Sequence, residues 1–352
     1  MVESAGQRGG LDRLGIASPH AFEDVRATMD DRLGNGLAGK LTFTYKDPGT
    51  ATTPLVSFPW ARSLVVGLRS YLPEAGPTVP RRGYGRVARF AVSDPYEPLR
   101  SGLQCVATAL EAEGFRAEVV IDDDRLVDRA VAVRAGIGWW GKSTMVLTPG
   151  IGPWFVIGSV VTDAGLEPDP PMIRTCGSCV ACVPACPTGA LSTPGTLDAR
   201  RCLAAIAQSA GIIPRQWRQA MGDRLYGCDD CLDACPPGVR AATREGPQGG
   251  VSIEWVLTAA DTTLMESFSH FYLPGRRPRI IRRNALVVAG NQPGAGLERL
   301  VSQYVGHPDW ILRAHAVWAL ARIGGEMTRP VLVDQLRHES HADVLTELHH
   351  EL

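Results

Sequence analysis

The chain has 352 residues, 45% of them hydrophobic and 21% charged, and a formal net charge of −1. This balance is typical of a globular protein of two or three domains and argues against a globally basic nucleic-acid binder, although it leaves room for a local basic patch. No apolar run is long enough to span a bilayer, and the N-terminal segment lacks a signal-peptide pattern, so we expect a cytoplasmic protein.

The first 165 residues alternate between strand-like and helical segments. Short runs rich in β-branched residues predict strands at 63–72, 117–122, 144–149 and 154–163. Apolar residues at helical spacing predict a helix over 96–114 and a second over 125–136. Residues 1–165 are therefore expected to form an α/β domain. Cys105 lies close to the apolar stripe of the first helix and is expected to be a buried, inert thiol.

The segment AGIGWWGKST, residues 135–144, contains two nucleotide-binding patterns, G-x-G-x-x-G and G-x-x-x-x-G-K-S. Both patterns bind phosphate only where a strand precedes the glycines and a helix follows them. Here the predicted helix precedes them and the predicted strand follows. We therefore expect neither a dinucleotide nor a phosphate-loop site. The glycines still predict a tight loop that brings the backbone close to something large.

Eight of the nine cysteines fall within 60 residues. Cys176, Cys179, Cys182 and Cys186-Pro187 have the C-x2-C-x2-C-x3-C-P spacing of bacterial ferredoxins. A second, incomplete run follows, and Cys202 can supply its missing member. Because the fourth cysteine of each run binds the other cluster in two-cluster ferredoxins, the spacing predicts two [4Fe–4S] clusters. One would be held by Cys176, Cys179, Cys182 and Cys235, and the other by Cys186, Cys202, Cys228 and Cys231. Two structural zinc sites are the alternative.

Proline-rich breaks at 166–175 and 235–250 enclose this region, so we expect a two-cluster domain over 166–245 and a helical domain over 246–352. Two alanine-rich helices, 283–291 and 314–325, repeat after about thirty residues, as in short HEAT-like repeats; a plain helical subdomain is the alternative. Five arginines near the start of this domain predict contact with nucleic-acid phosphates, or else a solvated helix start: Arg276, Arg277, Arg279, Arg282 and Arg283.

Several segments together resemble the epoxyqueuosine reductase family. They are the segment 121–163, the CGSCVACVPACPTGAL run, LDARRC, DRLYGCDDCLDACP and the helical tail with RRNALVVAGN and RAHAVWALARIG. The resemblance implies an α+β multidomain fold with a nitroreductase-like α/β cobalamin domain, a ferredoxin-like two-cluster module and a HEAT-like helical domain. It also implies cobalamin as a cofactor, an external electron donor, and a monomer that reduces epoxyqueuosine to queuosine in tRNA.

The resemblance also implies site residues. The acid segment of the family, V-D-S-x-P-x-x-E-R, matches IDDDRLVDR and places the proton donor and a cofactor contact at Asp122. Three consecutive carboxylates also fit a solvated turn. In the family loop A-G-x-G-W-x-G-K-N-T, Ser143 replaces the asparagine, and Lys142, Ser143 and Thr144 are expected to border the corrin.

Two departures put the substrate in question. The D-Y-H segment of the family is SDPYEPLR here, without a histidine, and the arginine expected before an Asp-Pro pair is absent from TYKDPGT. A cobalamin reductase of a small molecule or organohalide is therefore an alternative, favoured by the missing histidine. A non-catalytic two-cluster electron carrier is another, although such a carrier needs neither the long α/β domain nor the Asp122 segment.

Overall fold

The computed structural model describes residues 1–352 except 41, 73–80, 243–249 and 327. The chain forms two compact units, each built from three stretches of sequence. The first unit comprises Met1–Gly76, Ser93–Cys202 and Asp229–Gly246, and the second Pro77–Val92, Leu203–Cys228 and Pro247–Leu352. The predicted boundary at 245/246 lies outside the described residues, so the three-domain division stays a prediction. Within the described parts, no helix is long and apolar enough to cross a membrane.

A four-stranded antiparallel sheet of order β1-β2-β7-β4 forms the centre of the first unit. Its strands are β1 Arg13–Ala17, β2 Ser63–Ser70, β7 Phe155–Thr162 and β4 Ala117–Val120. The predicted strands at 63–72, 117–122 and 154–163 are thus confirmed, while the run at 144–149 contributes only the two-residue strand β6, Val146–Leu147. The two inner strands are continuous apolar runs because both of their faces are covered.

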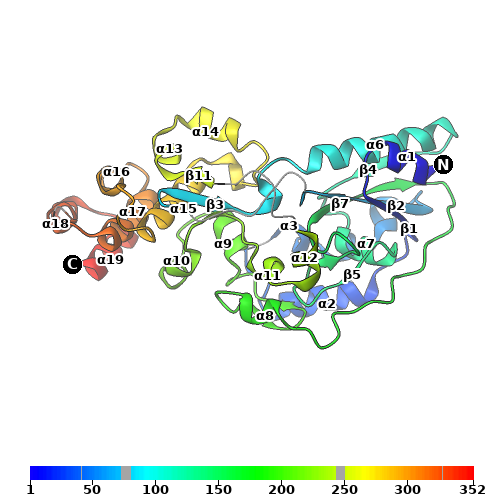
Figure 1. The fold of residues 1–352 in the computed structure, drawn as a ribbon, viewed down its shortest axis with the longest axis horizontal. Helices are drawn as coiled ribbons and strands as arrows, with labels where there is room; N and C mark the ends of the chain where they lie inside the picture. Colours follow the sequence, from blue (N-terminus) through cyan, green and yellow to red (C-terminus); the bar gives the residue numbers. More distant parts are fainter. Residues whose placement is uncertain (41, 73–80, 243–249, 327) are drawn as a thin grey trace. The chain divides into compact units, whose positions relative to one another are not determined.

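Helix α6, Tyr96–Ala112, covers one face of the sheet together with α1, Val2–Arg8, and α7, Asp128–Arg134, packs on the other face (Figure 1). Gly67 and Gly158 are register partners on β2 and β7, and a Cβ on either would lie within 2.9 Å of the Leu103 side chain. The missing side chains therefore let α6 approach the sheet closely.

The remaining elements of this unit are short. They are α2 Glu23–Gly34, α3 Thr42–Tyr45, α4 Pro48–Thr52, α5 Pro54–Ser57, β5 Trp139–Trp140, α8 Cys182–Ala185, β8 Leu191–Thr193, β9 Thr196–Leu197, α11 Asp230–Asp233 and α12 Pro236–Ala241. β5 and β6 form a small hairpin, so the order helix, glycines, strand predicted for AGIGWWGKST is confirmed.

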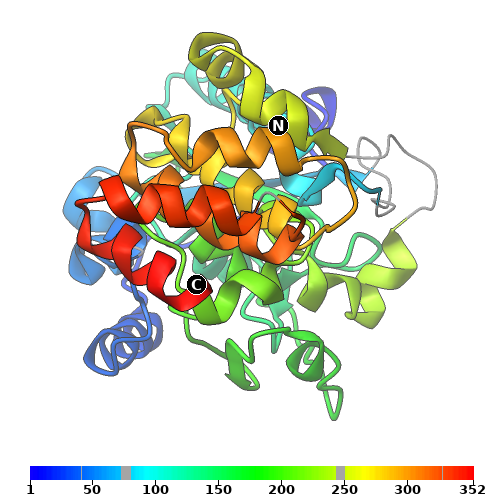
Figure 2. The same ribbon diagram turned by 90° about the vertical axis from the view of Figure 1, so that its left-hand side faces the viewer.

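The second unit is largely helical. Its elements are β3 Tyr84–Val87, η2 Arg89–Ala91, α9 Leu203–Gln208, α10 Arg215–Met221, β10 Arg224–Tyr226, β11 Gly250–Ser252, α13 Ile253–Thr258, α14 Asp261–Ser267, η3 Pro274–Arg276, α15 Arg279–Gly290, α16 Glu298–Tyr304, α17 Trp310–Ile323, α18 Thr328–His338 and α19 Ala342–Glu351. Helix α17 packs against α15, α16 and α19, and the C-terminal helices lie side by side in Figure 2, where they are orange to red. These stacked helices bury one continuous apolar core.

Candidate iron–sulfur and reductase site

The first cysteine group, Cys176, Cys179, Cys182 and Cys235, is gathered in one part of the first unit. Cys182 begins α8, and Cys235 precedes the first turn of α12. Both are buried, and burial is the main cause that raises the pKa of each thiol. The neighbouring cysteines of the group raise both pKa values further, which requires the four thiols to be close to one another.

An apolar wall lies behind this group. Trp139, Leu147 and Met172 pack with Cys176 and Cys235 in one cluster. Trp139 is only 8% exposed, and its indole Nε1–H has no hydrogen-bond partner among the described residues. A buried donor without an acceptor costs free energy, so an acceptor beside these thiols is expected there.

Zinc and a cluster need different arrangements of these thiols. A zinc site needs its ligands around one ion, whereas each thiolate of a [4Fe–4S] cluster binds a different iron. Across the described part of the chain, no three His, Cys, Asp or Glu side chains are grouped as ligands of a single ion.

Three members of the second cysteine group lie in the first unit. Cys186 directly follows α8, and Cys231 lies on α11, which packs against α8. Cys202 follows Arg201, which exchanges two hydrogen bonds with Thr188. Burial raises the pKa of the Cys186 thiol, but hydrogen bonds from the backbone around Leu191 and Thr188 outweigh it and lower the pKa. Such a site favours a thiolate, the form that binds metal. Cys228 belongs to the second unit.

The β5–β6 hairpin carries the predicted cofactor residues Lys142, Ser143 and Thr144 in its turn. Lys142 Nζ donates a 2.6 Å hydrogen bond to the carbonyl oxygen of Gly177, in the loop of the first cysteine group. Ser143 is buried, and Thr144 has a left-handed backbone with φ +67°. Only three described non-glycine residues have positive φ, namely Asp122, Thr144 and Arg276, and all three are predicted site residues. Such strain tends to persist at functional sites.

The glycines before this hairpin allow close packing within the chain. A Cβ at Gly136 would lie 2.3 Å from the carbonyl oxygen of Pro170, and one at Gly138 would meet Val146 and Leu147. These contacts account for the two glycines within the fold, and the approach of a large external group to the loop stays a prediction.

Asp122 lies just beyond β4 with φ +49°, and the residue is exposed. Protein around its carboxyl still desolvates it, and this burial is the largest cause that raises its pKa; Arg129 lowers the pKa and Asp123 raises it. The next two acids are paired, since Arg125 donates to Asp123 at 2.7 Å and Lys46 lies 3.9 Å from Asp124. Asp122 therefore differs from the two acids beside it, which are paired with cations.

A further carboxyl, Asp128 at the start of α7, adjoins Asp122. Burial raises its pKa well above the ordinary value, the charge of Asp122 adds to this, and a backbone hydrogen bond from Asp122 opposes it. Its Oδ1 is buried with no hydrogen-bond partner among the described residues. Asp128 was not among the predicted site residues, because a single acid at a helix start carries no signal of burial in the sequence.

The five arginines predicted to contact nucleic acid are not equivalent. Arg283 is 1% exposed and donates to the carbonyl oxygens of Ser209, Gly211, Ile206 and Ala207, so its predicted phosphate contact is wrong. Arg276 binds backbone carbonyls at the end of α14. Arg279 pairs with Asp309, and Arg282 pairs with Asp261. Arg277 is exposed, so its guanidinium can contact a phosphate.

The prediction for Cys105 is also wrong, because its thiol is exposed. The buried stripe of α6 consists of Leu99, Leu103, Val106 and Leu110. Cys105 immediately precedes a member of this stripe, which on a helix turns its side chain about 100° away from the core.

Comparison with known proteins explains the cysteine pattern. Residues 175–238 match the 4Fe-4S double cluster binding domain, and residues 275–352 match HEAT repeats. The chain is 30% identical to the epoxyqueuosine reductase of Bacillus cereus, over 96% of this chain and 92% of that protein. It is 31% identical to the enzyme of Bacillus subtilis, over 96% and 91%.

The chain belongs to the epoxyqueuosine reductase family. It is accordingly an oxidoreductase, which excludes the non-catalytic electron carrier, and the double-cluster match confirms iron–sulfur cofactors in place of zinc. The HEAT-like prediction for the C-terminal helices is also confirmed.

Solved epoxyqueuosine reductases share the fold. A selenomethionine-labelled crystal structure matches with a TM-score of 0.92 and 28% identity, over 99% of this chain and 96% of that one. A second structure, with the same TM-score, identity and coverage, is that of an epoxyqueuosine reductase with an epoxyqueuosine-modified tRNA-Tyr stem loop. A third, from Bacillus subtilis, has its catalytic aspartate loop swung out of the active site, with a TM-score of 0.91.

Proposed function

We propose that this chain reduces epoxyqueuosine to queuosine in tRNA, with two [4Fe–4S] clusters and cobalamin as cofactors. The observation that carries the proposal is that one folded unit holds both the first cysteine group and Asp122, an acid on a left-handed turn with a raised pKa. Family relatives named epoxyqueuosine reductase and the relative that holds a modified tRNA stem loop support the substrate.

The clusters fit the residues present. The first group supplies four neighbouring thiols and, in Trp139 Nε1–H, a buried donor that a cluster sulfur can accept. The second cluster would take Cys186, Cys202, Cys228 and Cys231, as the ferredoxin-like spacing predicts. The lowered pKa of Cys186 supports thiolate ligation there.

Cobalamin fits through the polar residues that would border it. Asp122 and Thr144 both hold strained left-handed backbones, and Ser143 is a buried hydroxyl beside Thr144. Lys142 is hydrogen-bonded to the cluster loop, so the turn that would border the corrin also contacts the first cysteine group. When bound, cobalamin supplies a low-valent metal that passes electrons to the substrate.

The protein must supply protons to the departing epoxide oxygen. Removing an epoxide oxygen as water to leave an alkene consumes two electrons and two protons. Asp122 would protonate the departing oxygen, because its raised pKa keeps the carboxyl protonated to higher pH than an ordinary aspartate. Its exposure allows the spent carboxylate to recover a proton from solvent. An aspartate loop that moves in a relative supports this role for a residue on a turn.

The electrons would come from an external donor to a monomeric enzyme in the cytoplasm. For tRNA, the exposed Arg277 is the strongest phosphate contact of the five arginines. Arg276, Arg279 and Arg282 would contribute less, because each is already engaged within the fold.

The test is anaerobic reconstitution with iron, sulfide and cobalamin, followed by nucleoside analysis of epoxyqueuosine-containing tRNA. We expect conversion to queuosine, and Asp122→Asn should slow it by about 10²- to 10⁴-fold, the usual contribution of a general acid. Asp124→Asn is the matched control, since it removes an adjacent carboxylate that is partly exposed and only weakly paired. Bound cobalamin without any conversion would overturn the substrate, and full turnover by the Asp122 variant would overturn the acid.

A further inference from the structure

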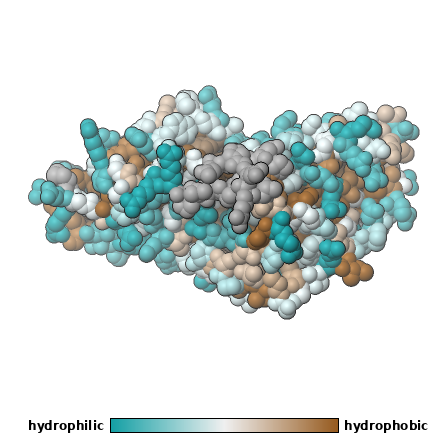
Figure 3. Space-filling view, viewed as in Figure 1, coloured by the Kyte–Doolittle hydropathy of each residue, from teal (hydrophilic) through white to brown (hydrophobic). Residues whose placement is uncertain are grey.

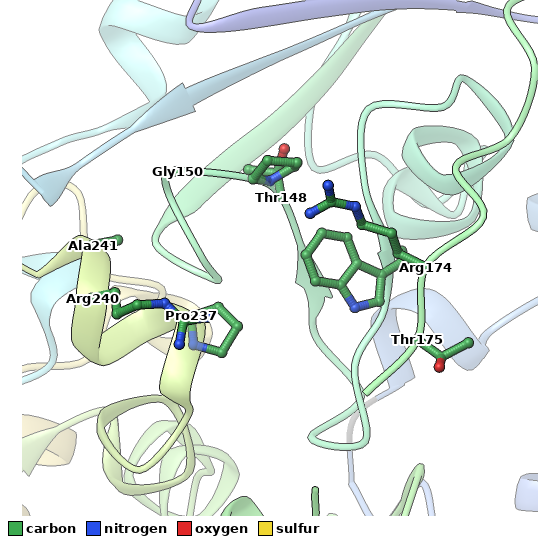
Figure 4. A pocket seen from close by; sticks show the side chains of 9 residues that line it. Thr148, Gly150, Arg174, Thr175, Pro237, Arg240 and Ala241 are labelled. Carbon is green, nitrogen blue, oxygen red and sulfur yellow. The ribbon is translucent and has the colours of Figure 1, made fainter. Parts of the chain in front are cut away.

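The first cysteine group lies beside a cavity whose lining includes neither Asp122 nor the turn residues Lys142, Ser143 and Thr144. The cavity has a volume of about 530 Å³ and is lined by residues that include Trp139, Thr148, Arg174, Thr175, Pro237 and Arg240. Figure 4 shows Arg174 and Thr175 on one side of it and Pro237, Arg240 and Ala241 on the other. Thr175 directly precedes Cys176 and Pro237 follows Cys235 by two residues, so the cavity opens next to the first cysteine group.

The charge around this cavity has one sign. The three segments that border it, 139–150, 172–182 and 235–242, contain Lys142, Arg174 and Arg240 and no acidic residue. The side chains of Arg174 and Arg240 are exposed, and neither has a hydrogen-bond or ion-pair partner among the described residues. Arg174 instead lies 5.7 Å from the centre of the Trp139 ring. Before Arg174, the nearest acids along the chain are Glu167 and Asp169, of which Asp169 accepts a hydrogen bond from the backbone of Ile16. Asp230 and Asp233 of α11 interact within the fold.

Exposed apolar side chains occur in the same segments as these cations, and Ile173 and Val239 directly precede Arg174 and Arg240. Ile173 is fully exposed, and Trp140, Val180 and Val239 are each more than two-fifths exposed. In Figure 3, hydrophobic and neutral side chains gather over the region where Figure 1 places α8 and its flanking loops. Unpaired arginines among exposed apolar residues are the usual composition of a protein-binding surface.

We propose that this arginine surface, formed by Ile173, Arg174, Val239 and Arg240, is the docking surface for a small acidic electron-donor protein of the flavodoxin or ferredoxin class. The proposal rests on the proposed function, which places a [4Fe–4S] cluster in the first cysteine group. At each encounter the reduced donor loses one electron and the cluster gains it, so two encounters supply the two electrons of one epoxide reduction. The exposed loop residues Gly177 and Ser178 leave the edge of the cysteine group open to such a donor.

The experiment compares two reductants on the reconstituted full-length enzyme under anaerobic conditions. One is flavodoxin reduced to its hydroquinone, and the other is the methyl viologen radical, a small cation that needs no acidic docking. Cluster reduction is followed by stopped-flow loss of the visible cluster absorbance. The variant is Arg174→Glu/Arg240→Glu, and Arg8→Glu/Arg100→Glu is the control, because it makes the same change of charge at exposed positions elsewhere in the first unit.

We expect the double variant to be reduced by flavodoxin roughly tenfold or more slowly at low salt, with the difference shrinking as salt rises. Its reduction by methyl viologen and the behaviour of the control should stay unchanged. Equal rates with flavodoxin, or equal slowing with both reductants, would overturn the proposal. Inorganic phosphate that binds the wild type, requires both arginines and leaves flavodoxin reduction unaffected would also overturn it, because the cavity would then be a small-anion site.

These results are distinguishable from failure of the proposed function. If epoxyqueuosine reduction is absent with both reductants while the clusters still accept electrons, the substrate is wrong and the docking surface is tested independently. If no cluster assembles in the first cysteine group, its visible absorbance is missing before any donor is added, and the docking proposal falls with it.

Discussion

Asp122, the proposed proton donor, lies beside the buried carboxyl of Asp128, and its charge helps to raise the pKa of that second acid. Because burial raises the pKa of Asp128 so strongly, its carboxyl is expected to stay neutral while Asp122 titrates. A neutral Asp128 adds no full negative charge beside the strained turn at Asp122. The charged group that sets the pKa of Asp122 most directly is then Arg129, which opposes the effect of burial.

We predict that Arg129→Gln moves the alkaline limb of the pH–rate profile to higher pH. Arg129 lowers the pKa of Asp122, so its removal lets the carboxyl keep its proton as the pH rises. The acid form is needed for turnover and is lost above its pKa. The rate on the alkaline side should therefore increase by up to about tenfold, the change that one unit of pKa produces.

The control for this prediction is Arg129→Lys, which keeps a positive charge at the same exposed position. Its profile should stay close to that of the wild type when kcat is measured by nucleoside analysis across the pH range. An identical limb in the glutamine variant, or an equal shift in the lysine variant, would show that charge at this position does not tune the acid.

We predict that Trp139→Phe makes the reduction potential of the first cluster more negative. The indole N–H is buried without a partner, and a hydrogen bond to cluster sulfur stabilises the more negative, reduced state. A hydrogen bond of about 1 kcal/mol corresponds to roughly 40 mV for one electron. Redox titration followed by electron paramagnetic resonance measures the shift. Trp140→Phe, at the adjacent exposed position, should leave the potential unchanged, and equal potentials in all three proteins would remove this role for the indole.

The cluster ligands were predictable because a cluster requires cysteines at short, fixed spacings in the sequence. The central strands were predictable because both of their faces are covered, which makes them continuous apolar runs. Contacts between distant segments were not predictable. The arginine run reads as a basic patch, yet helix α15 turns Arg283 toward the same side as Ile280 and Val287. There its guanidinium donates hydrogen bonds to carbonyl oxygens at the end of α9. No sequence pattern predicts this contact. The cavity beside Trp139 likewise forms from segments almost 100 residues apart.

We predict that Arg277→Ala changes tRNA binding, whereas Arg283→Ala changes the stability of the fold. Arg277 is exposed, so its removal should leave stability within about 0.5 kcal/mol and reduce the salt dependence of tRNA binding by roughly 0.9 in the log–log slope. Arg283 is buried among carbonyl oxygens, so its removal should lower the free energy of unfolding by about 3 kcal/mol or more. Fluorescence anisotropy with a tRNA stem loop and urea unfolding measure the two effects. If the Arg283 variant keeps its stability but reduces the salt dependence of tRNA binding, Arg283 contacts phosphate after all.

We predict that Glu347→Gln destabilises the second unit. Arg218 is fully buried and donates a 2.5 Å hydrogen bond to Glu347, which is also paired with Arg215 at 2.8 Å. Removing one partner of a buried ion pair leaves the other charge uncompensated, which costs about 3–5 kcal/mol. The matched control is Asp30→Asn, which breaks the ion pair with Arg26 on an exposed helix surface and should cost at most about 1 kcal/mol.

Urea unfolding monitored by circular dichroism compares the two variants with the wild type. The glutamine variant should unfold at a lower urea concentration than the wild type, while the asparagine variant should unfold close to the wild-type midpoint. Equal midpoints for both variants would mean that Glu347 is solvated and that Arg218 is balanced elsewhere. The structure opposes that result, because the Arg218 side chain is 0% exposed, its Nη1 has no hydrogen-bond partner among the described residues, and a buried guanidinium needs its counter-charge.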